Sequence, residues 1–185
     1  MSGARPAEGE TMAGGDRQGQ ALARKKRIGI VVPQLGIPSE VWILRQCQEF
    51  ERIEPVLLYW DIRPGAAGIP PELELVRFRT DFERRRTLWS RIRRRLGSPS
   101  AIWPTADQAA DIRQVIAEAD VEAVLCHFAW TGLRVSKALE DGPPVVWQVH
   151  GRDVSALMSD KAYRRAIAAV LPRAWPLAPR SHRGA

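Results

Sequence analysis

The chain has 185 residues, and 45% of them are hydrophobic, which is enough for one domain of ordinary size with its own core. The formal net charge is +7, but seven arginines between Arg84 and Arg95 account for all of the excess, because the remaining 21 basic residues balance 21 acidic ones. Cys47 and Cys126 lie within apolar patterns and lack the spacing of a zinc site, so we expect two reduced core thiols in a cytosolic protein. No apolar run is long enough to span a bilayer.

The first elements are read from hydrophobic patterns and turn residues. Residues 1–26 lack the apolar segment of a secretory signal and are expected to form a disordered leader. The apolar run Arg27–Val32 predicts a first strand, followed by a loop over residues 33–38 with a glycine between two prolines. Ser39 is predicted to cap the next helix, with Glu40 in its first turn.

Strands and helices are predicted to alternate along the rest of the chain. The patterns predict strands at residues 55–60, 73–78, 123–126 and 145–149, and helices at 82–96, 105–119, 131–140 and 160–171. Thr105 and Gln108 form a capping-box pattern at the start of one helix. This order predicts an α/β domain over residues 27–171, with a Rossmann-like parallel sheet and helices on both faces. Residues 172–185 have no period and are expected to be an irregular tail, either disordered or out of frame.

Two histidines follow predicted strands. The β-branched run from Val145 predicts a strand buried on both faces, and it ends at His150 and Gly151. Ligands in open α/β sheets bind beyond the carboxyl ends of the strands, so His150 is a candidate for the chemistry. Alternatively, it caps the sheet or bonds a loop carbonyl. His127 follows another short strand, and we expect a structural role for it.

Three segments at successive strand ends carry a family resemblance. Residues 33–45 (PQLGIPSEVWILR), 125–128 (LCHF) and 149–154 (VHGRDV) resemble elements of the amino-terminal half of family 4 glycosyltransferases. The resemblance covers residues 27–170. It implies one half of a two-domain B-type glycosyltransferase, in which this half binds the acceptor and the other binds a nucleotide-sugar donor, usually without a metal ion.

The resemblance also implies roles for individual residues. His150 matches the catalytic histidine near the donor sugar and its phosphate, and Gly36 matches the loop position whose backbone N–H approaches the diphosphate. Asp153 matches the acid after the His-Gly pair, and either bonds a sugar hydroxyl or caps the next turn. Gly36 is otherwise a turn glycine, and His127 is either structural or substrate-binding.

Two departures from the family pattern limit this interpretation. Gly36 is single where many relatives have two adjacent glycines, and no two glutamates have the Glu-x7-Glu spacing of the donor-binding half. We therefore expect a truncated acceptor-binding domain, inactive alone, with a glycan or lipid-linked acceptor. The alternatives are a non-catalytic α/β module that binds anionic membrane or a ligand, and one subunit of a split glycosyltransferase with its donor domain on a separate chain.

The arginine-rich segment at residues 82–96 has three interpretations. Its apolar stripe packs on the sheet and leaves the arginines solvated, or it lies on anionic lipid with Trp89 near the headgroups. Nucleic-acid binding is third, because no binding motif accompanies the arginines. In the lipid interpretation the protein is cytoplasmic and touches the inner membrane face. The residues predicted to contact membrane or acceptor are Trp89, Arg91, Arg93, Arg94 and Arg95.

Overall fold

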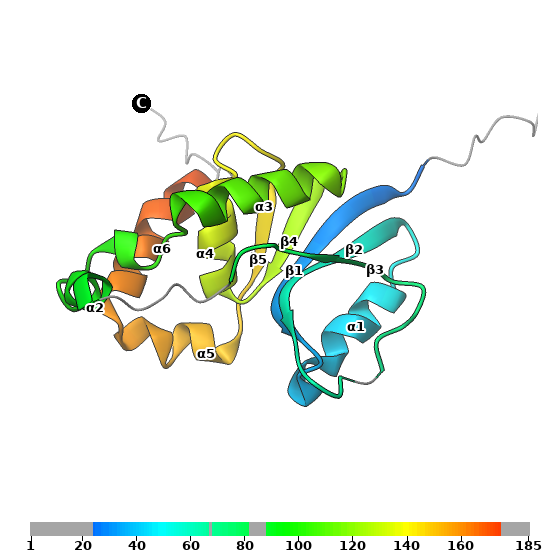
Figure 1. Ribbon diagram of the computed structural model, residues 1–185, viewed down its shortest axis with the longest axis horizontal. Helices are drawn as coiled ribbons and strands as arrows, with labels where there is room; N and C mark the ends of the chain where they lie inside the picture. Colours follow the sequence, from blue (N-terminus) through cyan, green and yellow to red (C-terminus); the bar gives the residue numbers. More distant parts are fainter. Residues whose placement is uncertain (1–23, 67, 82–87, 175–185) are drawn as a thin grey trace, which may run out of the picture.

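The computed structural model describes residues 24–66, 68–81 and 88–174 (Figure 1). Five parallel strands form one sheet in the order β3-β2-β1-β4-β5. The strands are β1 (Lys26–Leu35), β2 (Ile53–Ile62), β3 (Glu74–Arg77), β4 (Ala123–His127) and β5 (Val145–Gln148). The predicted Rossmann-like α/β fold is therefore confirmed.

Helices cover the two faces of the sheet unequally. The helices are α1 (Val41–Gln48), α2 (Leu88–Arg95), α3 (Ala106–Glu118), α4 (Ala129–Ala138), α5 (Gly151–Val154) and α6 (Lys161–Ala174). On one face α1 packs on Ile30, Val32 and Leu57, and on the other α3 and α4 pack on residues such as Val31 and Leu58. Adjacent residues of a strand point to opposite faces, which explains the apolar runs of β1 and β2.

The strand β5 differs from its prediction as a strand buried on both faces. In the described part of the chain it is the last strand of the sheet and pairs with β4 alone, and Val146 is 58% exposed. Its other face is covered, since Trp147 packs against α4 and its Nε1 donates to Ser136 Oγ at 2.9 Å. The apolar run correctly predicted a strand, but the prediction that both faces of this strand are buried was wrong.

Two helix starts show where the sequence pattern succeeded and failed. Thr105 and Gln108 form the predicted capping box at the start of α3. Ser39 is not the predicted cap, because Pro38–Glu40 form a 3-10 turn and α1 begins at Val41 without a side-chain cap. Both cysteines are free and buried, as expected for core thiols.

The structure places both chain-end boundaries slightly differently from the sequence. β1 begins at Lys26, inside the predicted leader, and α6 continues to Ala174, three residues into the predicted tail. Residues 1–23 and 175–185, which hold the rest of those two segments, lie outside the described residues.

The arginine-rich helix is not packed as the first interpretation held. Residues 82–87 lie outside the described part, and α2 begins at Leu88. Leu88, Trp89 and Leu96 are 70–72% exposed, so the apolar stripe does not lie on the sheet. Instead, Arg94 joins α2 to Asp160, which directly precedes α6.

At the amino-terminal edge of the sheet, one arginine links three strands and a helix. The guanidinium of Arg27, at the start of β1, binds Glu54 of β2 and Glu74 of β3, and it donates to the carbonyl of Ala119 behind α3. One side chain thereby connects the beginnings of three adjacent strands and the end of a helix.

Candidate functional site

The candidate site lies at the opposite, carboxyl-terminal edge of the sheet. The chain leaves β1 toward β2 and β3 on one side, and β4 and β5 lie on the other side. In open α/β sheets, ligands bind at such a switch point, beyond the carboxyl ends of the strands, and here it falls between β1 and β4. Gly36 follows β1, His127 is the last residue of β4, and His150 follows β5, so all three predicted site residues lie at this edge.

His127 is the last residue of β4 and is completely buried. Neither of its ring nitrogens has a hydrogen-bond partner among the described residues. Its ring centroid lies 5.0 Å from that of Trp42 and 5.8 Å from that of His150. Burial, with a smaller contribution from the charge of His150, lowers the pKa of His127 to about 4, so the ring is neutral at pH 7.

His150 follows β5 and is held in place through its backbone. Its N–H donates to Asp153 Oδ2 at 2.9 Å, and the Tyr163 hydroxyl donates to Asp153 Oδ1 at 3.4 Å. Asp153 is only 1% exposed, so of its two predicted roles the structure shows the capping one. The imidazole itself contacts Trp42 and Phe128, and its Nε2 is buried without a partner in the described structure.

The connection after β4 contains an unusual backbone conformation. Phe128 has a φ of 73°, a region that residues other than glycine rarely adopt. Its N–H donates to the carbonyl of Gln148 at 3.0 Å, which holds the tips of β4 and β5 together. Strained residues of this kind concentrate at binding sites, and this one lies beside both histidines.

Gly36 is required by the turn itself. Its φ is +79°, and a Cβ there would lie 2.3 Å from the Cβ of Ala66 in the loop after β2. The turn-glycine alternative is therefore sufficient to explain this residue. The approach of its backbone N–H to a diphosphate stays a prediction.

Beside Gly36 lies a pocket of about 270 Å³, lined mainly by apolar residues of β1 and α1. Glu40 lines it, and its Oε2 is buried without a partner among the described residues. Burial raises the pKa of Glu40. In the sequence, Glu40 is recognisable only as an acid in the first turn of the predicted helix. Trp42, two residues further on, was missed as a site residue, because its contact with both histidines depends on how β1, β4 and β5 are ordered.

Unsatisfied polar atoms concentrate at this edge. Eight buried side-chain nitrogen or oxygen atoms of the described residues lack partners, and five of them lie near the carboxyl ends of β1, β4 and β5. They are Glu40 Oε2, His127 Nδ1, His127 Nε2, Thr131 Oγ1 and His150 Nε2. Leaving such atoms unpaired is costly, so their concentration is typical of a site that a ligand completes.

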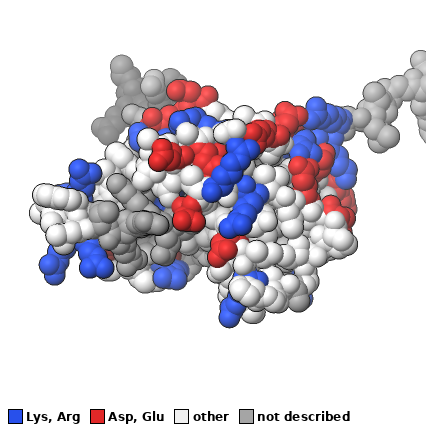
Figure 2. Space-filling view, in the orientation of Figure 1, with Lys and Arg blue, Asp and Glu red and all other residues white. Residues whose placement is uncertain are grey.

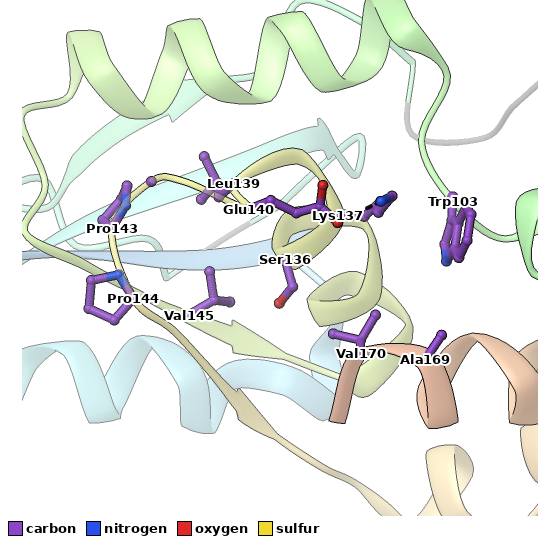
Figure 3. Close-up of a pocket in the computed structure, with 11 residues that line it drawn as sticks. Trp103, Ser136, Lys137, Leu139, Glu140, Pro143, Pro144, Val145, Ala169 and Val170 are labelled. Atoms are coloured by element: carbon purple, nitrogen blue, oxygen red, sulfur yellow. Dashed lines mark hydrogen bonds and ion pairs between the residues drawn. The ribbon is translucent and has the colours of Figure 1, made fainter. Parts of the chain in front are cut away.

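A second pocket, of about 330 Å³, lies near the amino-terminal end of β5, between α4 and α6 (Figure 3). Its charged groups pair with each other, since Lys137 Nζ binds Glu140 Oε1 at 2.6 Å. The same ammonium lies 5.0 Å from the ring centroid of Trp103, whose Nε1 is buried without a partner in the described part of the chain. This pocket has one buried polar atom without a partner, whereas the carboxyl edge has five. The carboxyl edge is therefore the stronger candidate site.

Metal-ligand groups, membrane-spanning helices and similarity to known proteins say little about the function of this chain. Within the described residues, no group of three or more His, Cys, Asp or Glu side chains could hold a metal ion. No helix in that part of the chain is both long enough and apolar enough to cross a membrane. No family model and no curated protein matches the sequence. The residues at the carboxyl edge are therefore the main guide to what the chain binds.

Proposed function

We propose that this chain is the acceptor-binding domain of a glycosyltransferase that uses a nucleotide-sugar donor. The observation that supports it best is the pair His127 and His150 at the switch point of a parallel sheet, with three buried ring nitrogens left without partners. The resemblance of residues 33–45, 125–128 and 149–154 to family 4 glycosyltransferases points the same way.

The chemistry of sugar transfer suits these imidazoles. Breaking the donor's glycosidic bond places negative charge on a leaving diphosphate, which a hydrogen-bond donor stabilises. In the proposal His150, held by Asp153, donates to a sugar or phosphate oxygen. His127 is neutral, so it contributes a hydrogen bond rather than a charge.

The carboxyl group of Glu40 distinguishes two parts of the proposed site. A carboxyl group in an apolar pocket disfavours phosphate and suits a ligand that presents hydroxyl groups. We therefore assign the pocket beside Gly36 to the hydroxyl-rich acceptor and the histidine pair to the phosphate side. Glu40 lines the pocket, and Trp42, two residues further along the chain, contacts both histidine rings.

Ring resonances of the histidines test the proposal directly. The chain has three histidines, so selective ¹³C labelling gives three resolvable signals. We would titrate the full chain with inorganic pyrophosphate, UDP-glucose and methyl glucoside. The His127 and His150 signals should shift with UDP-glucose and pyrophosphate, and His150→Gln should weaken UDP-glucose binding about tenfold, the effect of one lost hydrogen bond to a charged group.

Two controls complete the design. His182→Gln removes the third histidine and should leave the affinities for UDP-glucose and pyrophosphate unchanged. Glu40→Gln should alter methyl glucoside binding and leave pyrophosphate binding within a factor of two. If neither His127 nor His150 responds to any of the three compounds, the proposal is wrong.

A further inference from the structure

The helix α2 lies at one end of the molecule (Figure 1). It presents apolar side chains to solvent. Leu88 and Trp89 are each 72% exposed, Leu96 is 70% exposed and Ile92 38%. Large apolar side chains that are contiguous and this exposed mark an interaction surface rather than ordinary surface variation.

Helical geometry sorts the residues of α2 by direction. Leu96 directly follows α2 and continues its last turn, since its N–H donates to the carbonyl of Ile92 at 2.9 Å. At about 100° per residue, Leu88, Trp89, Ile92 and Leu96 fall within an arc of about 100°. Arg91 and Arg95 border this arc on one side and Arg93 on the other, while Arg94 points away from it. The helix thus has an apolar centre, a basic margin on each side and one arginine on the back.

The back of α2 is fixed to the body of the protein. Arg94 Nε donates to Asp160 Oδ2 at 2.6 Å, and Asp160 Oδ1 accepts the N–H of Ala162 at 2.8 Å. Burial opposes the charge of Asp160, but these hydrogen bonds prevail and lower its pKa. Arg165 also donates to the carbonyl of Gly97 at 3.1 Å. The apolar stripe therefore faces outward because the opposite side is held against α6.

The basic margin of α2 carries positive charge that no described acidic residue neutralises. Arg91, Arg93 and Arg95 form no ion pair with any residue that the structure describes. Figure 2 shows uncharged atoms at the left end, where Figure 1 places α2, bordered by blue side chains, whereas blue and red side chains alternate elsewhere on this face.

We propose that α2 docks the protein on an anionic lipid surface. The four apolar side chains enter the boundary between headgroups and acyl chains, and the three marginal arginines contact lipid phosphates. A second copy of the chain fits less well, because pairing two stripes would bring the flanking arginines together. A nucleic acid would use the arginines but leave the stripe exposed. The inference is independent of the proposed sugar transfer.

Co-sedimentation of the full chain with vesicles tests the docking. Vesicles of phosphatidylcholine with about 30% phosphatidylglycerol, enough to give a negative surface potential, should bind the protein, and pure phosphatidylcholine vesicles much less. Replacing Arg91, Arg93 and Arg95 by Ser should weaken binding about 100-fold. Trp89→Ser should also weaken it, because the stripe loses its largest apolar side chain.

Matched variants distinguish the surface from overall charge. Replacing the exposed Arg45, Arg52 and Arg63 by Ser removes the same charge elsewhere and should leave vesicle binding within a factor of three. His150→Gln should bind vesicles normally, which separates this inference from the proposed function. Circular dichroism should show unchanged helix content in every variant.

Three results would overturn the docking. The first is a failure of the charge test, seen as equal loss of binding in both arginine triples together with no preference for anionic vesicles. The second is tight binding to a DNA duplex that depends on Arg91, Arg93 and Arg95 but not on Trp89, which would indicate a polyanion site. The third is a dimer in light scattering that Leu88→Ser converts to a monomer, which would show that the stripe serves self-association.

Discussion

At the scale of single residues, the buried histidine at the end of β4 is the most unusual feature. A completely buried imidazole normally bonds at least one neighbour, yet both nitrogens of His127 are without partners in the described structure. Aromatic rings of Trp42 and His150 surround it instead. The position therefore costs stability in the free protein, which is acceptable where a ligand later supplies the missing bonds.

The pH dependence of stability should reveal this cost. The folded pKa of His127 is about 4, below the ordinary value of 6.5. Between these two values the unfolded chain takes up a proton that the folded chain refuses, so stability should fall as the pH drops from 6.5 to 4. One unit of pKa shift corresponds to about 1.4 kcal/mol, so the full loss should be about 3 kcal/mol. Urea unfolding at several pH values measures it.

Replacing the imidazole separates its contribution from that of other groups. His127→Leu should flatten this pH dependence and keep or raise stability at pH 7, because it removes unpaired polar atoms from the core. His182→Leu should change neither quantity. A large loss of stability at pH 7 in His127→Leu would show that the imidazole has a partner within the protein.

At the scale of elements, single side chains fasten helices to the sheet. Asp111 of α3 is 7% exposed, and its Oδ2 accepts three hydrogen bonds from the segment that follows β3. The donors are the N–H of Arg79 at 2.9 Å, the N–H of Thr80 at 2.8 Å and the hydroxyl of Thr80 at 2.7 Å. The carboxylate thus fixes the exit of an edge strand to a helix that packs on the sheet.

Removing this carboxylate should be costly. Asp111→Ala leaves two backbone N–H groups without acceptors and should lower the free energy of unfolding by about 3 kcal/mol. Asp107→Ala, in the exposed first turn of the same helix, should cost less than about 1 kcal/mol. Chemical denaturation of both variants gives the comparison. Equal effects would mean that the Asp111 hydrogen bonds add nothing beyond general helix electrostatics.

Elements could be predicted from the sequence where local rules decide them. The capping box at Thr105 and the alternation of strands and helices depend on neighbouring residues, and both are confirmed. The exposure of Val146 depends on which strand lies at the edge, which no local pattern contains. Trp42 likewise became a site residue only once the strand order placed it against His127 and His150. The turn at Gly36 was predictable, whereas the pocket beside it was not.

At the scale of the whole molecule, β5 is the last strand at one edge of the sheet. Among the described residues it has one neighbouring strand, and Val146 is 58% exposed on the face that α4 does not cover. An exposed apolar edge strand is a template for pairing with another chain. We therefore expect the chain to self-associate.

Sedimentation velocity over a range of concentrations tests this expectation. The wild-type chain should show a rising average mass, and Val146→Lys should reduce it, because a charged side chain on an edge strand opposes pairing. Val41→Lys, at a 41% exposed position on α1, provides the control and should behave like the wild type. A wild-type chain that remains monomeric throughout would contradict the prediction.

The opposite locations of Arg27 and the histidines have an evolutionary consequence. Arg27 joins the beginnings of β1, β2 and β3, while the unsatisfied polar atoms gather where strands end. If the proposed function is correct, substitutions in the loops after β1, β4 and β5 will change ligand recognition without loosening the arginine cluster. A chain of this design can acquire new ligands through successive mutations while its fold is preserved.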